Sequence, residues 1–212
     1  MRLTPSMFRN DPNTIIIRTP EVHEGEALLS YFRALFHESS QFMKFSSQFY
    51  DQQTKDFQEK FIESFNASER SFVLLAYAGI SIIGHIIIDN YGFERANHRA
   101  KLVMGLLKQY EGIGLGSALL TRAIDAAEQS GNLVLELQVK SFNNRAIKLY
   151  EKFNFEKVGC IRAAAHIDDE YYDELIYQYI FPSLQLKLNH SANEQLLDSN
   201  ANVNHSQRLF GI

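Results

Sequence analysis

Residues 102–130, LVMGLLKQYEGIGLGSALLTRAIDAAEQS, contain the pattern around which the rest of the chain is organised. The apolar run at 102–107 predicts a buried strand, and Gly112, Gly114 and Gly116 then alternate where the strand gives way to a helix. The helix is indicated by small and apolar residues that recur at about one helical turn: Leu115, Leu119, Ala123 and Ala126. Glycine lets a ligand approach the backbone closely, and the first N–H groups of a helix lack internal partners. This arrangement favours an anion site suited to phosphates.

The glycine pattern taken alone leaves its purpose open. One explanation is purely structural, because glycines also shape a tight turn between a strand and a helix. The pattern is not a Walker loop, since no Gly-Lys-Ser/Thr follows it. It is also one residue short of a dinucleotide fingerprint, because Ser117 stands where the third glycine belongs.

Composition and charge indicate one well-packed domain. The chain has 212 residues, of which 45% are hydrophobic and 12% aromatic, and this suffices for a single core. A formal net charge of -4 argues against a protein that binds a nucleic-acid backbone. The single cysteine, Cys160, excludes an internal disulfide and predicts a reducing, cytoplasmic compartment. Its apolar surroundings predict a buried structural thiol.

No membrane partner is expected. The N-terminal residues lack the apolar region of a signal peptide. Phe72 to Ile88 carries no formal charge and is nearly long enough to cross a bilayer, but glycine and other small or polar residues interrupt it. Two core strands joined by a turn near Ala78 and Gly79 explain this segment better.

The order of the predicted elements gives the fold class. The expected strands lie at 14–18, in the hairpin 72–89, and at 102–107, 133–139, 156–167 and 171–181. The expected helices start at Pro20 with Thr19 as cap, around Phe57, Phe61 and Phe65, at the glycine turn, and over 144–153. This order predicts an α/β fold with a single mixed sheet and helices on both faces. We expect a domain at 1–182 and a polar, flexible tail at 183–212.

Three segments together resemble the GCN5-related N-acetyltransferase (GNAT) family: KQYEGIGLGSALLTRAIDAAEQSG, LVLELQV and NNRAIKLYEKFNFEKVG. The resemblance covers about Ile15 to Phe181 and is densest from Leu102 to Gly159. It implies an acyl-CoA N-acyltransferase fold with a mostly antiparallel sheet, and acetyl-CoA as co-substrate without a metal. It also implies that the glycine loop holds the pyrophosphate and that the preceding strand pairs with the pantetheine arm. The cofactor-binding residues so implied are Met104, Gly105, Leu106, Gly112, Ile113, Gly114, Leu115, Gly116, Ser117, Asn143 and Tyr150.

One position departs from the family pattern. That pattern has Arg or Gln three residues before the first motif glycine, and Glu111 stands there when Gly114 and Gly116 are the motif glycines. The other register, with Gln109 first, makes the helix start too late. Because a carboxylate beside a pyrophosphate is unfavourable, we expect the backbone amides to supply most of the anion site. We also expect Glu111→Arg to tighten CoA binding, most clearly at low salt.

Spacing and resemblance give different interpretations of Tyr150. Asn143 is placed to cap the helix that follows it, and Tyr150 lies two turns further on the same side. Spacing alone makes Tyr150 part of a core stripe with Ala146 and Phe153. The resemblance implies instead that Tyr150 is catalytic and protonates the departing CoA thiolate.

No general base is assigned from the sequence. The acceptor amine must be neutral when it attacks, so some group or water must take up a proton. Gln138 stands where some family members have a glutamate, and Glu136, on the same strand face, could replace it or could simply be a solvated carboxylate. His85, His98 and Glu174 are further candidates. The sequence contains no His/Cys cluster with metal-ligand spacing and no Gly-x-Ser-x-Gly elbow.

The resemblance therefore implies a cytoplasmic N-acetyltransferase. It would move an acetyl group from acetyl-CoA directly to a primary amine of a small molecule, such as an amino acid or a polyamine, in a ternary complex. Protein N-terminal or lysine acetylation is the alternative among enzymes. A non-catalytic acyl-CoA-binding sensor is the alternative of another class, favoured if Glu111 and Gln138 mark a site that has lost activity.

The acceptor is expected between the first two helices and the closing hairpin. Residues 41–50 and 167–172 would shape that pocket. Asp168, Asp169 and Glu170 could attract a cationic substrate or could simply be solvated. The expected partner is thus a small-molecule amine rather than a nucleic acid or a membrane, and a homodimer is compatible with the sequence.

Overall fold

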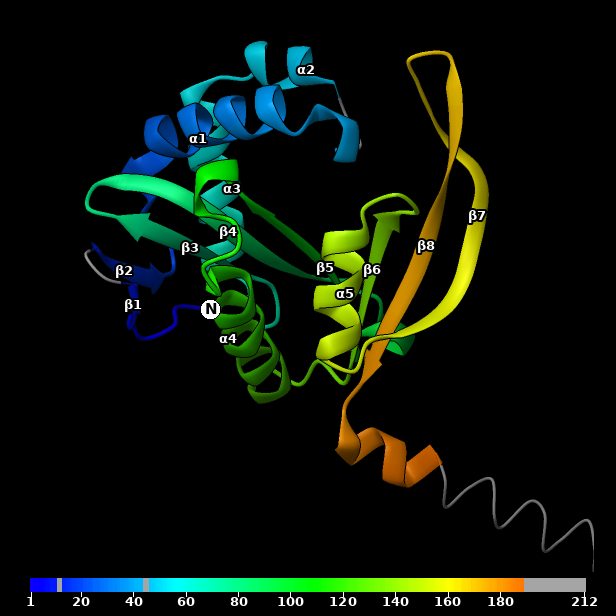
Figure 1. Ribbon diagram of the computed structural model, residues 1–212. Coiled ribbons are helices and arrows are strands. Elements are labelled where there is room, and N and C mark those ends of the chain that lie inside the picture. The colour runs from blue at the N-terminus through cyan, green and yellow to red at the C-terminus, as the bar shows by residue number, and fades with distance from the viewer. Residues whose placement is uncertain (11–12, 44–45, 189–212) are drawn as a thin grey trace, which may run out of the picture. The chain divides into compact units, whose positions relative to one another are not determined.

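The computed structural model describes residues 1–10, 13–43 and 46–188, and its first compact unit is Met1–Tyr179 (Figure 1). The strands are β1 (Ser6–Asn10), β2 (Asn13–Arg18), β3 (Phe72–Ala78), β4 (Ser81–Asn90), β5 (Arg99–Leu106), β6 (Val134–Lys140), β7 (Glu156–Ile167) and β8 (Glu170–Ile180). The helices are α1 (Gly25–Glu38), α2 (Ser47–Asp51), α3 (Lys55–Ala67), α4 (Leu115–Gln129) and α5 (Asn144–Lys152). Short 3-10 turns lie at Val22–Glu24, Ser40–Phe42, Glu94–Ala96 and Lys108–Tyr110.

Within the described residues, all eight strands form one mixed sheet in the order β1-β2-β3-β4-β5-β6-β8-β7. Strands β1 to β5 pair antiparallel with their neighbours, as do β7 and β8. Strands β5 and β6 pair parallel, because α4 lies between them in the chain and carries it back across the sheet. The predicted mixed, mostly antiparallel sheet is therefore confirmed.

Helices cover both faces of this sheet (Figure 1). Alternate side chains of a strand point to opposite faces, and Val73, Leu75 and Tyr77 of β3 share one core cluster with apolar side chains of α1. On the other face, a Cβ placed on Gly84 of β4 would lie 3.5 Å from Leu119 Cδ1 of α4. The buried, nearly uncharged β3–β4 hairpin is thus the centre of the core, as the sequence predicts.

The first helix starts later than the sequence predicts. The expected start is Thr19 and Pro20, but both residues precede a 3-10 turn that leads into α1. The Glu24 carboxylate accepts a hydrogen bond from the Glu21 N–H at 2.7 Å and forms an ion pair with Arg18 at 2.7 Å. The Glu24 carboxylate thus caps the Glu21 N–H group, which lies after Thr19 in the chain. The expected cap at Thr19 is therefore wrong.

The second predicted helix, α3, is present, but its buried face differs from the predicted one. Gln58 and Ile62 are its buried residues, and Phe61 and Phe65 pack partly against the core. Phe57, in the first turn, is 50% exposed. The expectation that all three phenylalanines line one buried side is therefore wrong for Phe57.

Two features of the sheet edges were not predicted. Strand β1 is absent from the expected elements, because SMFRN has no clear alternation and forms a strand only by pairing with β2. Cys160 is exposed, so the prediction of a buried thiol is wrong. It lies on β7, the outermost strand on its side, where an apolar run does not lead to burial.

A second compact unit begins at Ile180, and residues 182–188 within it are helical. The remainder of the expected tail, 189–212, lies outside the described residues, so the flexible tail stays a prediction. None of the described helices is long and apolar enough to cross a membrane. The cytoplasmic location also stays a prediction.

Candidate functional site

Strands β5 and β6 pair only at one end. Their register runs from Arg99↔Val134 to Lys101↔Glu136, whereas β5 continues to Leu106. Beyond Lys101 the two strands therefore separate, and a gap opens between neighbouring strands of one sheet. The segment Met104–Leu106, predicted to bind a cofactor arm, lies on β5 beside this gap.

The direction of the β5 backbone groups follows from two hydrogen bonds. Arg99 O accepts from the Tyr91 N–H at 3.2 Å, and Leu107 N–H donates to Ile83 O at 3.0 Å, so both residues face the β4 side. Backbone groups alternate in direction along a strand. Met104 and Leu106 consequently direct their N–H and C=O groups toward the gap, whereas those of Gly105 face β4.

The glycine loop ends at the start of α4. Gly112 and Gly114 have φ angles of 80° and 88°, which other residues rarely adopt, and Gly114 is the N-cap residue. The first helical hydrogen bond runs from Ala118 N–H to Gly114 O at 3.1 Å. The N–H groups of residues 115–117 have no partner in the described part of the chain, and they carry the positive end of the helix dipole. These N–H groups are therefore available where the sequence predicts an anion site, and the site itself stays a prediction.

Helix α5 lies beside this loop. A Cβ on Gly116 would be 3.3 Å from Leu149 Cδ2, and a Cβ on Gly112 would be 3.6 Å from Arg145 Nη2. The Arg145 guanidinium also forms an ion pair with the Glu111 carboxylate. The carboxylate that departs from the family pattern is thus neutralised by a residue from another element.

The two further residues implied by the resemblance lie on α5 and before it. Asn143 Oδ1 accepts from the Ala146 N–H at 3.2 Å, so the predicted cap is formed. Tyr150 is only 7% exposed, and its ring lies 5.8 Å from that of Phe155. Burial raises the pKa of Tyr150 to about 12, so the phenol stays protonated near neutral pH. Its hydroxyl has no hydrogen-bond partner among the described residues, which leaves a proton available for donation.

The carboxylates considered as bases are already engaged. Glu136 accepts from Arg99 Nε at 2.6 Å, from the Tyr91 hydroxyl at 2.9 Å and from Gln178 Nε2 at 3.3 Å. Glu136 is therefore neither a free base nor a carboxylate that is simply solvated. Glu174 pairs with Lys140 at 2.7 Å. Such contacts hold both carboxylates in fixed positions.

His85 is buried against α1. Its Nδ1 lies 2.8 Å from the Tyr31 hydroxyl, which donates to Gly105 O at 2.9 Å. Because a carbonyl only accepts and the phenol has one proton, the imidazole Nδ1–H must donate to the phenol oxygen. Burial lowers the pKa of His85 to about 3, so the ring is neutral at pH 7 and a weak base for an ammonium ion. No general base is therefore assigned.

Three aromatic side chains connect the segments expected to shape the acceptor site. The ring centroids of Phe42 and Phe142 are 5.5 Å apart, and those of Phe142 and Tyr172 are 4.6 Å apart. Phe42 follows α1, Phe142 precedes α5 and Tyr172 is on β8. We call these residues the aromatic bridge. Phe142 was missed from sequence, although its aromatic side chain beside the capping Asn143 is a signal. Residues 44–45 of the expected 41–50 segment lie outside the described residues.

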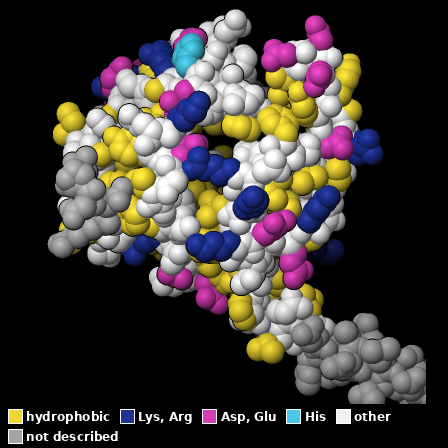
Figure 2. All heavy atoms as spheres, in the orientation of Figure 1, with side chains coloured by type: hydrophobic (Ala, Val, Ile, Leu, Met, Phe, Trp, Pro, Cys, Tyr) yellow, Lys and Arg dark blue, Asp and Glu magenta, His cyan; other side chains and the backbone are white. Residues whose placement is uncertain are grey.

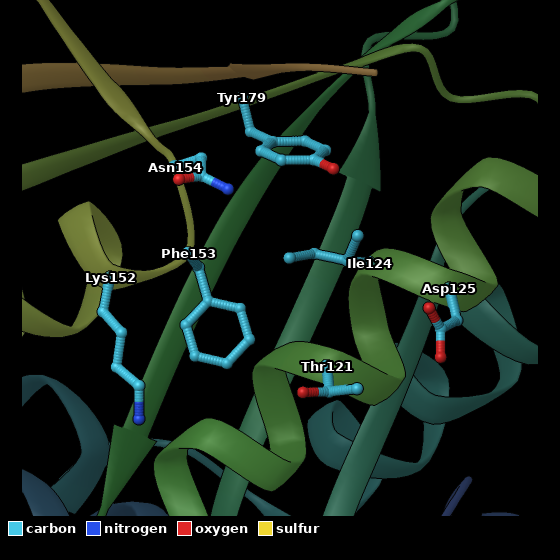
Figure 3. A pocket seen from close by; sticks show the side chains of 7 residues that line it. All are labelled: Thr121, Ile124, Asp125, Lys152, Phe153, Asn154 and Tyr179. Atoms are coloured by element: carbon cyan, nitrogen blue, oxygen red, sulfur yellow. The ribbon is translucent and has the colours of Figure 1, made fainter. Parts of the chain in front are cut away.

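A pocket of about 250 Å³ lies between α4, the end of α5 and β8. In Figure 3 the side chains of Phe153, Asn154 and Tyr179 come together over Ile124, whereas Asp125 points away. Its lining residues are Thr121, Ile124, Asp125, Lys152, Phe153, Asn154 and Tyr179. The pocket contains none of the predicted site residues, so we give it no part in the chemistry. No group of three or more His, Cys, Asp or Glu side chains suited to a metal occurs in the described part of the chain.

A model of the acetyltransferase (GNAT) family matches residues 32–155. The chain is similar to "Probable N-acetyltransferase san" of Drosophila melanogaster, with 31% identity over 85 residues, and to an N-alpha-acetyltransferase of Sulfurisphaera tokodaii, with 29% over 111 residues. These matches cover 40% and 48% of this chain, and 46% and 66% of those relatives. The crystal structure of a GNAT-family acetyltransferase from Streptococcus pneumoniae has a TM-score of 0.74 and 27% identity, and it covers 79% of this chain and 99% of that one.

Proposed function

The chain belongs to the acetyltransferase (GNAT) family, and on that premise we propose that it transfers an acetyl group from acetyl-CoA to a primary amine of a small molecule. The proposal rests on two structural features that lie next to each other along the chain. Strands β5 and β6 separate after Lys101, and the unpaired N–H groups at the start of α4 lie at the end of the loop that follows β5. One provides an edge for an extended arm, and the other provides a site for its phosphates.

The residues present fit acetyl-CoA. The loop Gly112 to Ser117 would receive the pyrophosphate, with the amides of residues 115–117 as donors. Met104 and Leu106 would pair with the amide groups of the pantetheine arm, and Gly105 between them lies against β4 and Tyr31. The Asn143 side chain, already fixed by its cap contact, lies at the start of α5 and would contact the same arm.

Acetyl-CoA would supply an activated acetyl group as a thioester. Tyr150 would donate its Oη proton toward the departing sulfur, which is consistent with an unpartnered, protonated phenol. Because the pKa of Tyr150 is raised above that of a thiol near 8.5, hydrogen-bond donation is easier than complete proton transfer. Because the Glu136 and Glu174 carboxylates are already engaged, the amine proton would leave through water.

The aromatic bridge supports a small acceptor. It joins the segment after α1 to β8 across the turn before α5, so it limits how far an acceptor can extend. The names of curated relatives favour a second candidate, because two of them are N-alpha-acetyltransferases. An N-terminal peptide amine is therefore the alternative acceptor.

A panel of acceptors tests the proposal. Purified protein is mixed with acetyl-CoA and, separately, with amino acids, polyamines and short peptides, and thiol release and acetylated product are both measured. Transfer to small amines above the rate for peptides supports the proposal. Faster transfer to peptide N-termini supports the alternative. Binding of acetyl-CoA without transfer to any amine would indicate the non-catalytic sensor.

A further inference from the structure

The ion pair between Glu111 and Arg145 joins the glycine loop to α5. It connects residues that are 34 positions apart, from two elements that both border the anion site. Glu111 is the residue where the family pattern has Arg or Gln. Position 111 therefore has no cationic side chain, but the Arg145 guanidinium lies next to it.

The packing of α5 places this cation at the loop. Arg145 and Leu149 are four residues apart, so they lie on the same side of the helix. Leu149 approaches Gly116 and Arg145 approaches Gly112, so consecutive turns of α5 face consecutive parts of the loop. The Arg145 side chain is 55% exposed, and the guanidinium thus retains access to a ligand.

A guanidinium has five N–H donors in a planar fork, and one carboxylate cannot use them all. We infer that Arg145 supplies the side-chain cation for the pyrophosphate that the loop lacks at position 111, and that Glu111 is the positioning residue that holds it there. This inference rests on the proposed function, because it takes acetyl-CoA as the anionic ligand. Glu111 is then part of the cofactor site instead of a defect in it.

General positive charge is the competing explanation. Figure 2 shows Lys and Arg side chains gathered over α5 and the start of α4, with acidic side chains among them. Lys148 is one turn beyond Arg145 on the same helix and is also exposed. Lys148→Met removes the same charge as Arg145→Met, so it is the matched control.

Calorimetric titration of the full chain with CoA and with dephospho-CoA tests the inference. Arg145→Met should weaken the binding of both ligands roughly tenfold, as expected for a charge-assisted contact, whereas Lys148→Met should change it less than about twofold. The salt dependence of binding should also be shallower in Arg145→Met than in the unaltered protein. Thermal unfolding without ligand should be nearly unchanged, because an exposed ion pair contributes little to stability.

The positioning residue has its own test in the Arg145→Met background. There the Glu111 carboxylate is left unpaired beside the anion, so adding Glu111→Gln should recover about threefold of the lost affinity. Equal effects of Arg145→Met and Lys148→Met, or an effect that vanishes with dephospho-CoA, would overturn the assignment to the pyrophosphate. Absence of CoA binding to the unaltered protein would instead remove the proposed function itself.

Discussion

A packing role and a catalytic role of Tyr150 predict different results when only its hydroxyl oxygen is removed. Its ring is buried beside Phe155, so Tyr150→Phe keeps the packing and should leave thermal stability similar. If the hydroxyl donates to the departing sulfur, kcat should fall by roughly 10²–10⁴-fold, the range for losing a positioned proton donor. Steady-state kinetics with acetyl-CoA and an active amine measure this.

The control experiment varies the leaving group of the thioester. A thioester of a more acidic thiol needs less protonation, so Tyr150→Phe should lose less rate with it. Affinity for acetyl-CoA should change little. Turnover within about threefold of the unaltered enzyme corresponds to little over half a kcal/mol in the barrier and would make Tyr150 a packing residue alone.

His85 couples stability to pH. The pKa of His85 is lowered by burial to about 3 from an ordinary value near 6.5, so below pH 6.5 the unfolded chain binds a proton that the folded protein does not. Stability should therefore be fully present above pH 6.5 and should fall toward pH 3 by about 1.4 kcal/mol per unit from this residue. His85→Gln should remove that part of the slope in denaturant unfolding from pH 4 to 7.

The ion-pair partner of Glu111 could not be predicted from the sequence. The motif register assigns its position, and the helix start at Leu115 agrees with that register. The compensating Arg145 becomes visible only when α5 is packed on the loop, because no local pattern links residues 34 positions apart. The expectation that Glu111→Arg tightens CoA binding stays a prediction, but the substitution also removes the carboxylate that holds Arg145.

At the scale of elements, strand β5, the glycine loop and helix α4 were predictable together. The run at 102–107 predicts the strand observed at Arg99–Leu106, and the glycines mark the helix start because positive φ angles are needed there. Strand β1 and the later start of α1 were not predictable. Strand β1 has no clear alternation of its own and forms by pairing with the next strand, β2. The start of α1 depends on carboxylate contacts that replace an ordinary serine or threonine cap.

The loop geometry predicts the result of adding a side chain. Gly114 has a φ of 88° and open space around its Cβ position, apart from Phe8 at 3.7 Å. Gly114→Val should cost stability through backbone strain and should also abolish the rise in melting temperature that acetyl-CoA gives by mass action. Thermal unfolding with and without acetyl-CoA measures both effects.

Gly79 provides the matched control. It has a φ of 60° and nothing within 4 Å of its Cβ position, and it lies in the β3–β4 turn. Gly79→Val should lose a similar amount of stability yet keep the full ligand-induced shift. An equal shift in both variants would mean that the loop does not hold the cofactor.

At the scale of the whole molecule, the sequence predicts the class of the sheet and the cofactor side of the proposed site in more detail than the acceptor side. Most residues of the predicted cofactor side lie in one continuous segment, 104–117, so this motif is local, and Asn143 and Tyr150 belong to a second local motif. The proposed acceptor side would draw on the segment after α1, the turn before α5 and strand β8, which meet only in the folded chain. The acceptor itself therefore stays a proposal.

The aromatic bridge gives this proposal its sharpest test. Phe142→Ala removes both ring contacts of the bridge, and aromatic pairs contribute about 0.5–1.5 kcal/mol each. If the bridge bounds the acceptor site, KM for small amines should rise roughly tenfold while the Kd of acetyl-CoA stays unchanged, and peptide amines should become better acceptors relative to small ones. Phe93→Ala, at a phenylalanine that is 70% exposed in the loop after β4, is the control and should alter neither quantity. A Phe142→Ala enzyme with unaltered KM and unaltered acceptor preference would show that the bridge only supports the fold and that acceptor size is limited elsewhere.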